Sequence, residues 1–578
     1  MEPKISVILR PVEEPARVRL IFLALAFAVA ALFFVGTHHF WVAADSNVDE
    51  NAYLVSGKLL AQTGSPGYAA PDPFTLVGMM WIGTPEGRFY PKYPLGQTLL
   101  VATTYKLFGW RSPFLINPLL MTLGLLGAFL LIRDAVGSFG GLLGMIAMAA
   151  SPVLLAETND PDSHAAAVCF TTWGMFLLLR WWRTGRHRHA ALAGLLLGLS
   201  AITRYTEALA LLPMALVALF QLGHRAGHRE DLRRSLAGVG ALAAGWLLPV
   251  GVQVGFNLRV LHRLTGYGAT HESTAFSAAY FLEHWAAALH QLCTLGLPLL
   301  FPLGLLGLLL LTYREWRLGL VLWAWTLPNL LLYIAYYWAP DDIAYTRFYL
   351  TIFPPLLLGV AWLLTRPLPG PVALRRWIQP AVALLLVLGC GAFGLREILP
   401  TLKSIHQDQQ QAWNAGEAVR GVAPAGSVFF GPQHALLYLQ YAGDDYQLYS
   451  RVLFIPKRIA RLGRRDPRAP NAFQPERARA LFALLKGRTT VEMLRLQRDL
   501  AAESLRRGRR VFLLAPDRDS GWTDFADAKL DRLDGRSVQL RPVARWQGWE
   551  TDADETGERP EIDWLMLEVT ARPAPAAG

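Results

Sequence analysis

Long apolar segments recur along the chain up to about residue 398, and short polar loops separate them. Because a helix needs about 20 mostly apolar residues to cross a bilayer, this pattern predicts about eleven membrane-spanning helices. Two of the segments are short for a span and could merge or tilt. The predicted spans lie near residues 18–36, 113–132, 138–156, 164–181, 189–204, 206–222, 235–256, 291–312, 317–338, 347–365 and 376–398.

A first outer loop, of about residues 37–112, follows the first span. It includes "DENAYLVSGKLLAQTG", whose pattern predicts a helix lying along the membrane surface. Residues 93–109 are apolar but too short to cross a bilayer, so they predict an interfacial or re-entrant helix.

The apolar runs stop after residue 399, and the pattern of the tail is different. Short apolar strings such as "SVFFG", "RRVFLLAPD" and "DWLMLEVTA" alternate with helix-like stretches such as "ERARALFALLKG" and "TVEMLRLQRDLAAESLRRG". This alternation predicts a small soluble α/β domain over residues 399–570. The last residues, 571–578, predict a disordered tail.

Composition supports a polytopic α-helical membrane protein, because only 17% of the residues are charged and 53% are hydrophobic. The net charge of +11 does not require nucleic acid as a partner, since the basic residues gather in alternate loops. By the positive-inside rule, those loops lie on the cytoplasmic side. We therefore predict the cytoplasmic (inner) membrane, a cytoplasmic N-terminus and an extracytoplasmic tail domain, with the transmembrane part over residues 1–398. The basic loops are "RWWRTGRHRH", "GHRAGHREDLRR", "TYREWR" and "TRPLPGPVALRRW".

The first candidate site is the adjacent pair Asp49 and Glu50, close to the predicted membrane surface. One interpretation is a solvated loop beside a helix end. The other is catalytic, because adjacent carboxylates disfavour each other's ionisation and remain basic enough to accept a proton.

The motif "RFYPKYPLGQ" carries Lys92 between proline and aromatic residues, just before the predicted interfacial helix. A lysine there can hold a lipid phosphate as a point charge. An anchor for lipid headgroups without a catalytic role fits the same pattern equally well.

The motif "ETNDPDSHAAAVCF" places Asp160, Asp162 and His164 at the mouth of a predicted span. Ionisable groups near membrane depth are functional candidates, and an Asp-x-Asp spacing can bind a divalent cation. Helix capping explains one of the aspartates but not two together with a histidine.

Two further motifs belong to this outer side. In "WAPDDIAYTRFYLTIFPPLLLG", Arg347 begins an apolar helix, so its side chain should snorkel to the interface or pair with an anion. Either the neighbouring Asp341 and Asp342 or a lipid-borne phosphate fits that role, and Tyr345 is assigned with Arg347 to the phosphate. In "NLRVLHRLTGYGATHES", Tyr267 marks a loop that folds back over a cavity.

Taken in this order, the motifs resemble those of the GT-C superfamily of membrane glycosyltransferases. The likeness is to the branch of protein O-mannosyltransferases, aminoarabinose transferases and bacterial family-39/83 enzymes. It covers most of residues 18–398. The segments that carry it are "DENAY", "YPKYPLGQ", "DPDSH", "GLLLGLSAITRYTEALALLP" and "YTRFYLTIFPPLLL".

The resemblance implies an inverting glycosyltransferase with a polyprenyl-phosphate sugar, a hexose or a pentose, as donor. It implies that Asp49 is the catalytic base, that Glu50 orients it or the acceptor, and that Arg347 holds the leaving phosphate. Lys92 stands where the family has a Lys-Pro-Pro-Leu segment, although Tyr93 replaces the first proline here.

The acceptor is a hydroxyl of a lipid, glycan or protein. Its side of the site, or a metal shell, is assigned to four residues, and two of them, Asp160 and Asp162, are also the candidate ligands of a divalent metal, which the sequence leaves open. The four residues are Asp160, Asp162, His164 and Tyr267.

Two other classes of protein use charges near a membrane. A transporter or flippase for a lipid-linked or anionic substrate often has two related halves with broken helices at the midplane. The sequence has no internal repeat, and its charges gather at one predicted surface. A binding protein for lipid-linked sugar without catalysis is the other alternative.

Overall fold

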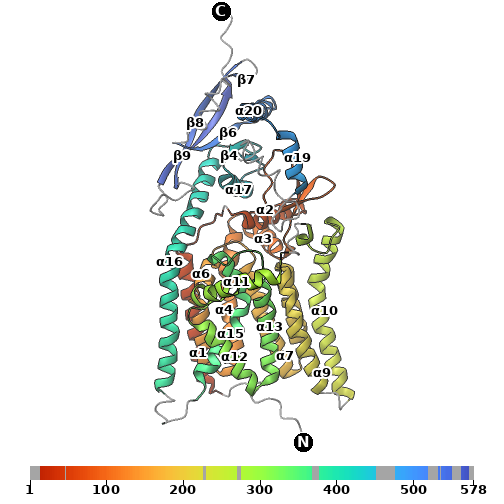
Figure 1. Cartoon of the computed structure of the whole chain (residues 1–578), viewed down its shortest axis with the longest axis vertical. Coiled ribbons are helices and arrows are strands. Elements are labelled where there is room, and N and C mark those ends of the chain that lie inside the picture. Colours follow the sequence, from red (N-terminus) through yellow and green to blue (C-terminus); the bar gives the residue numbers. More distant parts are fainter. Residues whose placement is uncertain are drawn as a thin grey trace, which may run out of the picture.

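A computed structural model describes residues 14–45, 47–224, 229–269, 275–367, 371, 377–450, 475–517, 532–533, 536–549 and 561–571. Its lower part is a bundle of roughly parallel and antiparallel helices, and a smaller α/β part stands above one end of the bundle (Figure 1). The bundle helices are α1 (Ala16–His38), α4 (Ile116–Val136), α5 (Ser138–Ala149), α6 (Pro152–Thr158), α7 (His164–Thr184), α8 (His187–Thr203), α9 (Leu211–His224), α10 (Arg229–Val260), α11 (Ala278–Gln291), α12 (Leu300–Arg314), α13 (Trp316–Ile334), α14 (Ile343–Thr346), α15 (Phe353–Thr365) and α16 (Gln379–Arg420).

The bundle confirms the predicted polytopic α-helical architecture, although several of the predicted spans differ in the structure. Within the described residues, eight helices are long and apolar enough to cross a membrane, or up to ten if each bent pair is one span. The predicted span at 189–204 is α8, whose 17 residues fall short of a full crossing. The predicted total of about eleven therefore depends on whether α8 spans the membrane.

Two predicted spans are not straight. The prediction of one helix over 138–156 is wrong, because α5 and α6 meet at 67°. The prediction over 291–312 is also wrong, because a 104° bend separates α11 and its π-helical end from α12. Pro152 is the first residue of α6, and Pro298 lies in the break before α12. The missing N–H and fixed ring of proline disfavour helical continuation through these positions.

The first outer loop folds over the end of the bundle. Its two predicted helices are confirmed as α2 (Val48–Thr63) and α3 (Leu95–Phe108), which lie above the bundle (Figure 1). Between them is a small antiparallel sheet with the strand order β1-β3-β2. These strands are β1 (Tyr68–Ala69), β2 (Trp81–Gly83) and β3 (Arg88–Pro91).

The C-terminal part is the predicted α/β domain, built on a six-stranded mixed sheet with the order β5-β4-β6-β9-β8-β7. Strands β5, β4 and β6 are parallel, and the pairs from β6 onward are antiparallel. The elements are β4 (Val428–Gly431), α17 (Gln433–Ala442), β5 (Gln447–Ser450), α19 (Pro475–Leu485), α20 (Thr490–Arg506), β6 (Val511–Pro516), β7 (Arg532–Leu533), β8 (Arg536–Trp549) and β9 (Glu561–Ala571). The predicted disordered tail lies outside the described residues beyond Ala571.

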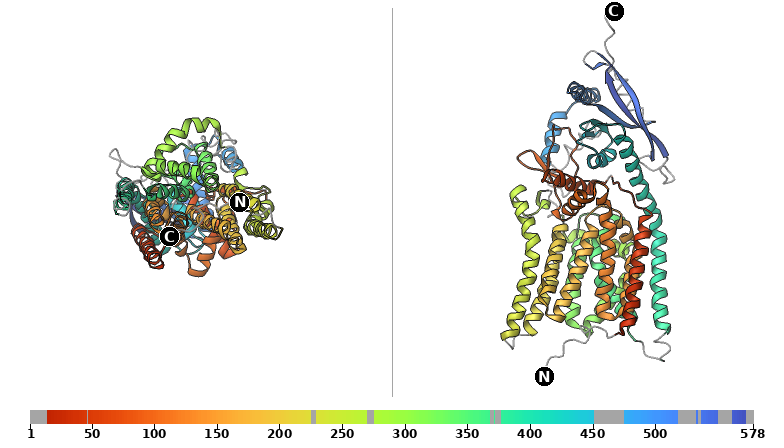
Figure 2. Two further views of the ribbon diagram at one scale, coloured as in Figure 1. Left: turned by 90° about the horizontal axis from the view of Figure 1, so that it is seen from below. Right: turned by 180° about the vertical axis from the view of Figure 1, so that it is seen from behind.

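Helix α16 joins the two parts without a break (Figures 1 and 2). Its 42 residues extend about 60 Å, roughly twice the thickness of a hydrocarbon core. The helix therefore passes through the predicted boundary at residue 398 and ends at Arg420 beside the sheet.

Candidate active site

A cavity of about 730 Å³ lies where the outer end of the bundle meets α2 and the C-terminal domain. The walls come from many regions of the chain, among them the start of α2, the loop between α6 and α7, the region around α14, and α17. The charged residues that line it are Asp49, Glu50, Lys92, Glu157, Asp160, Asp162, His164, Arg204, Arg347 and His434. The structure thus brings almost all of the sequence-predicted site residues to one place.

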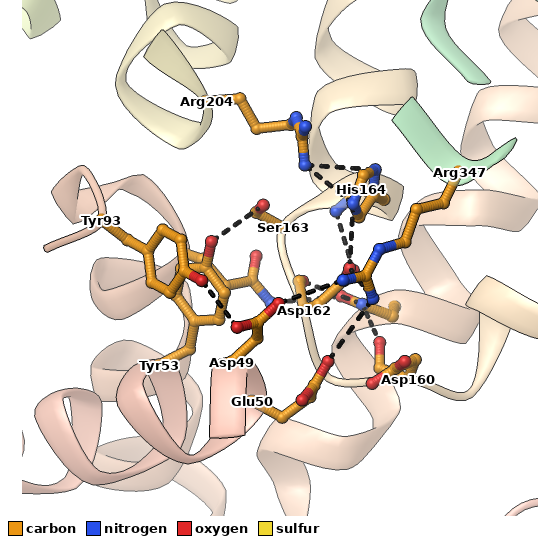
Figure 3. Close-up of polar contacts among 12 residues, drawn as sticks. Asp49, Glu50, Tyr53, Tyr93, Asp160, Asp162, Ser163, His164, Arg204 and Arg347 are labelled. Atoms are coloured by element: carbon orange, nitrogen blue, oxygen red, sulfur yellow. Dashed lines mark hydrogen bonds and ion pairs between the residues drawn. The ribbon is translucent and has the colours of Figure 1, made fainter. Parts of the chain in front are cut away.

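Helix α2 begins with the acidic pair because acidic side chains in a first turn are favoured by the helix dipole. Asp49 faces the cavity, and its side chain is 21% exposed. It accepts a hydrogen bond from the Tyr93 hydroxyl at 2.8 Å and one from the Arg347 guanidinium at 3.0 Å (Figure 3). Asp49 is therefore held in one orientation and remains accessible.

Glu50, the next residue, turns in a different direction. Its side chain is 1% exposed, and its carboxylate lies within 4.8 Å of those of Asp45 and Asp160. Burial, followed by repulsion from Asp45, raises the pKa of Glu50 well above its ordinary value. Burial likewise raises the pKa of Asp45 to about 7 and that of Asp160. The two adjacent carboxylates therefore lie in different environments: Asp49 is partly exposed, whereas Glu50 is buried.

Arg347 is the central cation of the site. It lies at the junction of α14 and the 3-10 helix that follows, and its guanidinium is 3.0 Å from Asp49 and 3.9 Å from both Glu50 and Asp162. Asp341 and Asp342, which the sequence offered as partners of Arg347, are not among the carboxylates with which it pairs in the described residues. Asp342 instead caps α14 by accepting a hydrogen bond from the backbone N–H of Tyr345 at 3.0 Å.

The two aspartates that the sequence left unresolved separate in the structure. Asp162 accepts a hydrogen bond from the backbone N–H of His164 at 2.8 Å and groups with Glu157 and His164. Asp160 points to the other side, toward Glu50 and Asp45. Burial raises the pKa of Asp162 to about 6, although Arg347 opposes that rise. The predicted joint metal site of Asp160 and Asp162 is therefore not a single site.

The Lys92 side chain is buried beside the aromatic rings of Tyr93 and Tyr267. It is 4% exposed, and its ammonium nitrogen lies 4.9 Å from the ring centre of Tyr93 and 5.7 Å from that of Tyr267. Such distances allow cation–π attraction. The loop of Tyr267 comes so close that a side chain at Gly266 would overlap the carbonyl oxygen of Lys92. The loop thus folds back onto the cavity, as its sequence predicted.

Tyr345 does not reach the cavity. It is fully buried, and its hydroxyl donates to the backbone carbonyl of Tyr333 at 2.7 Å and pairs with the hydroxyl of Tyr349. Its assignment to the donor phosphate is corrected accordingly, because the side chain packs inside the bundle.

The structure adds residues that the sequence reasoning missed. Arg204 donates to His164 at 2.8 Å and to the Tyr333 hydroxyl at 3.0 Å. The Tyr53 hydroxyl donates to Ser163 at 3.0 Å. The signal for Arg204 was its place as a cation between two apolar runs in "GLSAITRYTEALALLP". The cavity-lining residues of α17 gave no such signal, because only folding brings them to the bundle.

In the part of the chain that the structure describes, two groups of side chains have the chemistry to hold a metal ion. Glu157, Asp162 and His164 offer mixed oxygen and nitrogen ligands, but Arg204 and Arg347 already neutralise this group from close range. Asp45, Glu50 and Asp160 offer oxygen alone.

Comparisons with known proteins bear on the fold of this chain. Residues 92–250 match the family model described as dolichyl-phosphate-mannose-protein mannosyltransferase. ArnT of Cupriavidus metallidurans, solved bound to undecaprenyl phosphate, is 14% identical with a TM-score of 0.51, and the match covers 95% of this chain and 97% of ArnT. No curated protein matches the chain significantly.

A second solved structure is more distant. The oligosaccharyltransferase of Archaeoglobus fulgidus, in its apo form, is 11% identical with a TM-score of 0.46, and the match covers 94% of this chain and 74% of that one. The ArnT match shows that this chain shares the fold of ArnT along nearly its whole length. Together with the family-model match, it confirms the predicted resemblance in fold to GT-C membrane glycosyltransferases, and with it a multi-pass membrane protein.

Proposed function

We propose that this chain is a glycosyltransferase that moves a hexose or pentose from a polyprenyl phosphate to an acceptor hydroxyl, with inversion at the anomeric carbon. The observation that carries the proposal is the joint placement of Asp49, Arg347 and Lys92. A partly exposed carboxylate and two cations face one cavity at the end of the bundle. The likeness in fold to a protein solved with undecaprenyl phosphate supports the same donor class.

In the proposed reaction, Asp49 removes the proton of the acceptor hydroxyl. The acceptor oxygen then forms a bond to the anomeric carbon, while the bond from that carbon to the phosphate oxygen breaks on the opposite face. The electron pair of the broken bond leaves with the polyprenyl phosphate. Asp49 ends the step protonated, and the phosphate ends it with an added negative charge.

The contacts of Arg347 suit this transfer of charge. In the resting site its guanidinium pairs with ionised Asp49 at 3.0 Å. When Asp49 takes the proton, that pairing weakens, and the same guanidinium becomes available to the leaving phosphate. Lys92 adds a second cation close by. Such pre-placed charges stabilise the charge that develops in a transition state.

The other residues shape the two sides of the cavity. His164, held by Arg204, and Tyr267, over Lys92, line it and are assigned to the acceptor side. Asp162 fixes the start of α7 beside them. Glu50 has a supporting role, because its carboxylate is buried behind Asp49.

The orientation of the chain in the membrane is part of the same proposal. We place the N-terminus in the cytoplasm, and the cavity and residues 399–570 on the outer face of the inner membrane. Support comes from α7, which starts at the cavity and ends at Thr184, so that its arginine-rich loop lies at the far end of the bundle.

The proposal is tested with purified protein in liposomes and a panel of labelled polyprenyl-phosphate hexoses and pentoses. Label in a product together with free polyprenyl phosphate supports the enzyme. A transporter or flippase would move the labelled lipid across the bilayer with its sugar bond intact. Binding without either result would indicate a non-catalytic carrier.

A further inference from the structure

A second acidic cluster lies directly behind the proposed base. It consists of Asp45, Glu50 and Asp160, whose carboxylate oxygens all lie within 4.8 Å of one another. Figure 3 shows Glu50 and Asp160 close together below the Arg347 guanidinium. The side chains come from three separate segments: the loop after α1, the first turn of α2 and the loop after α6.

The cluster has too little positive charge around it. Arg347 reaches Glu50 at 3.9 Å, but it is closer to Asp49 and shares its charge with Asp162 as well. Among the described residues, no Lys, Arg or His lies within ion-pair distance of Asp45 or Asp160. Buried carboxylates without a charged partner are costly, and either protonation or a bound cation can offset that cost.

Within the cluster, the buried atoms without a hydrogen-bond partner are acceptors, whereas the nearby Nε of Arg347 is a buried donor without one. The acceptors include Oε2 of Glu50 and Oδ1 of Asp160. A third belongs to Gln409 of α16, a residue outside the acidic cluster that is only 3% exposed. Its amide faces the cluster, since its nitrogen lies 3.5 Å from a carboxylate oxygen of Asp45, and its Oε1 has no partner in the described part of the chain. Buried acceptors are nearly always satisfied by a donor or a cation.

We propose that Asp45, Glu50 and Asp160 bind a divalent cation of the Ca²⁺ or Mg²⁺ class, with the side-chain oxygen of Gln409 as a further ligand. Oxygen ligands alone favour these hard cations over zinc. The spacing is suitable, because two ligands on opposite sides of Ca²⁺ are about 5 Å apart. A rotation of the Gln409 amide exchanges its nitrogen and oxygen and presents Oε1 to the ion.

The cation would tie four parts of the chain together. It joins the loop after α1, the N-terminus of α2, the loop before α7, and α16 in the stretch that leaves the bundle. Asp49 is the neighbour of Glu50, so the ion would fix the position of the proposed base. That consequence rests on the proposed function, whereas the binding of the cation does not.

The binding is measured directly. Purified protein is treated with EDTA, reloaded with Ca²⁺ or Mg²⁺, passed through gel filtration and analysed for bound metal. We expect the wild type to retain a single cation per chain and the midpoint of thermal unfolding to rise with cation concentration. Asp45→Asn and Asp160→Asn should lose both the bound cation and the cation-dependent rise.

Two matched variants keep the test specific. Asp342→Asn makes the same change of charge at a helix cap outside the cluster, and Asp162→Asn makes it in the neighbouring group; both should retain the cation. A wild type that neither retains Ca²⁺ or Mg²⁺ nor changes its unfolding midpoint overturns the proposal. Loss of the cation in Asp162→Asn with retention in Asp45→Asn overturns it as well, by moving the ion to the other group. The wild-type titration keeps the test valid if a variant fails to fold.

Discussion

At the scale of single residues, a small number of cations compensates the negative charge of a larger number of carboxylates in the site. Arg347 alone contacts three of them, and it is itself 8% exposed. Removing such a residue leaves buried negative charges facing one another without compensation. Arg347 therefore has a structural role in addition to the phosphate-binding role that we propose for it.

Arg347→Gln should lower the free energy of unfolding by about 3 kcal/mol, because it breaks a buried ion pair from one side only. Adding Asp49→Asn to that variant should restore about 1 kcal/mol, since the two residues are in direct contact. Thermal unfolding of the single and double variants in detergent measures both values.

A matched arginine gives the control for this double-mutant cycle. Arg314 is exposed at the opposite end of the bundle, and Arg314→Gln should stay within about 0.5 kcal/mol of the wild type. If Arg347→Gln is as stable as Arg314→Gln, the assignment of Arg347 as the charge that holds the site together is wrong.

The sequence predicts individual site residues well where a charge interrupts an apolar pattern. Asp49, Glu50, Lys92 and Arg347 all stand out in this way, and all line the cavity. The partners within the site are not predictable, because they depend on distances across the chain. Asp49 and Arg347 are 298 positions apart.

At the scale of elements, a close approach between two backbone segments fixes where Lys92 lies in the cavity. The loop of Gly266 packs on the Lys92 backbone just before α3, and Gly266 donates its N–H to the Tyr205 hydroxyl at 3.4 Å. A side chain at this position has no room, so this glycine determines how near the two segments lie.

Gly266→Ala should therefore lower the rate of sugar transfer, because the loop must move away from Lys92 and take the Tyr267 ring with it. Gly255→Ala in α10 is the matched control, since an added methyl group there meets nothing within 4 Å. Transfer rates of the two alanine variants are compared at equal folded concentration. Equal rates in both variants would show that this close approach does not position Lys92.

Helix α2 is also tied to the C-terminal domain through a buried lysine. Lys58 donates hydrogen bonds to the backbone carbonyls of Tyr441 and Gly443. Burial lowers the pKa of Lys58 from its ordinary 10.5 to about 8. Between these two pH values the unfolded chain binds more protons than the folded one, so the contribution to stability rises with pH.

The stability of the wild type relative to Lys58→Met should therefore increase by about 1 kcal/mol per pH unit above pH 8. Thermal unfolding of both proteins between pH 7 and pH 9.5 measures this difference. A difference that stays constant or falls over that window would mean that Lys58 is not desolvated in the folded protein.

The elements themselves were predictable to different degrees. Apolar length predicted the spans, and the prolines at 152 and 298 explain why two of them bend. Strand β8 was not predicted, because its sequence "RSVQLRPVARWQGW" is rich in polar residues. It is stabilised as a strand by its antiparallel pairing with β9, which no local pattern shows.

At the scale of the whole molecule, the C-terminal domain forms part of the cavity. Gln433, His434 and Leu437 of α17 line it. The chain of the proposed polyprenyl-phosphate donor would stay in the bilayer, so this donor would approach from the bundle. We therefore assign the α17 wall to the acceptor side.

His434→Ala should raise the KM for the acceptor several-fold and leave the hydrolysis of the donor unchanged. His39→Ala is the control, because His39 is exposed at the same end of the bundle and does not line the cavity. Steady-state kinetics with varied acceptor at fixed donor gives the comparison. An unchanged acceptor KM would remove α17 from the acceptor side.

The sequence predicted two parts of the molecule and their order along the chain. How the two parts pack together was not predictable. It depends on the continuous helix α16, which crosses the expected boundary, and on polar contacts between residues that are far apart in the sequence. One such contact joins Asn51 of α2 to the carbonyl of Leu437 in α17 at 2.9 Å.

The most direct test of this account is transfer from labelled polyprenyl-phosphate sugars by the wild type, Asp49→Asn and Asp342→Asn, with folding checked by gel filtration. We predict that the wild type and Asp342→Asn transfer the sugar, whereas Asp49→Asn is folded and slower by at least about a hundredfold. Near-normal transfer by folded Asp49→Asn would contradict the account, because the proton of the acceptor would then have another destination.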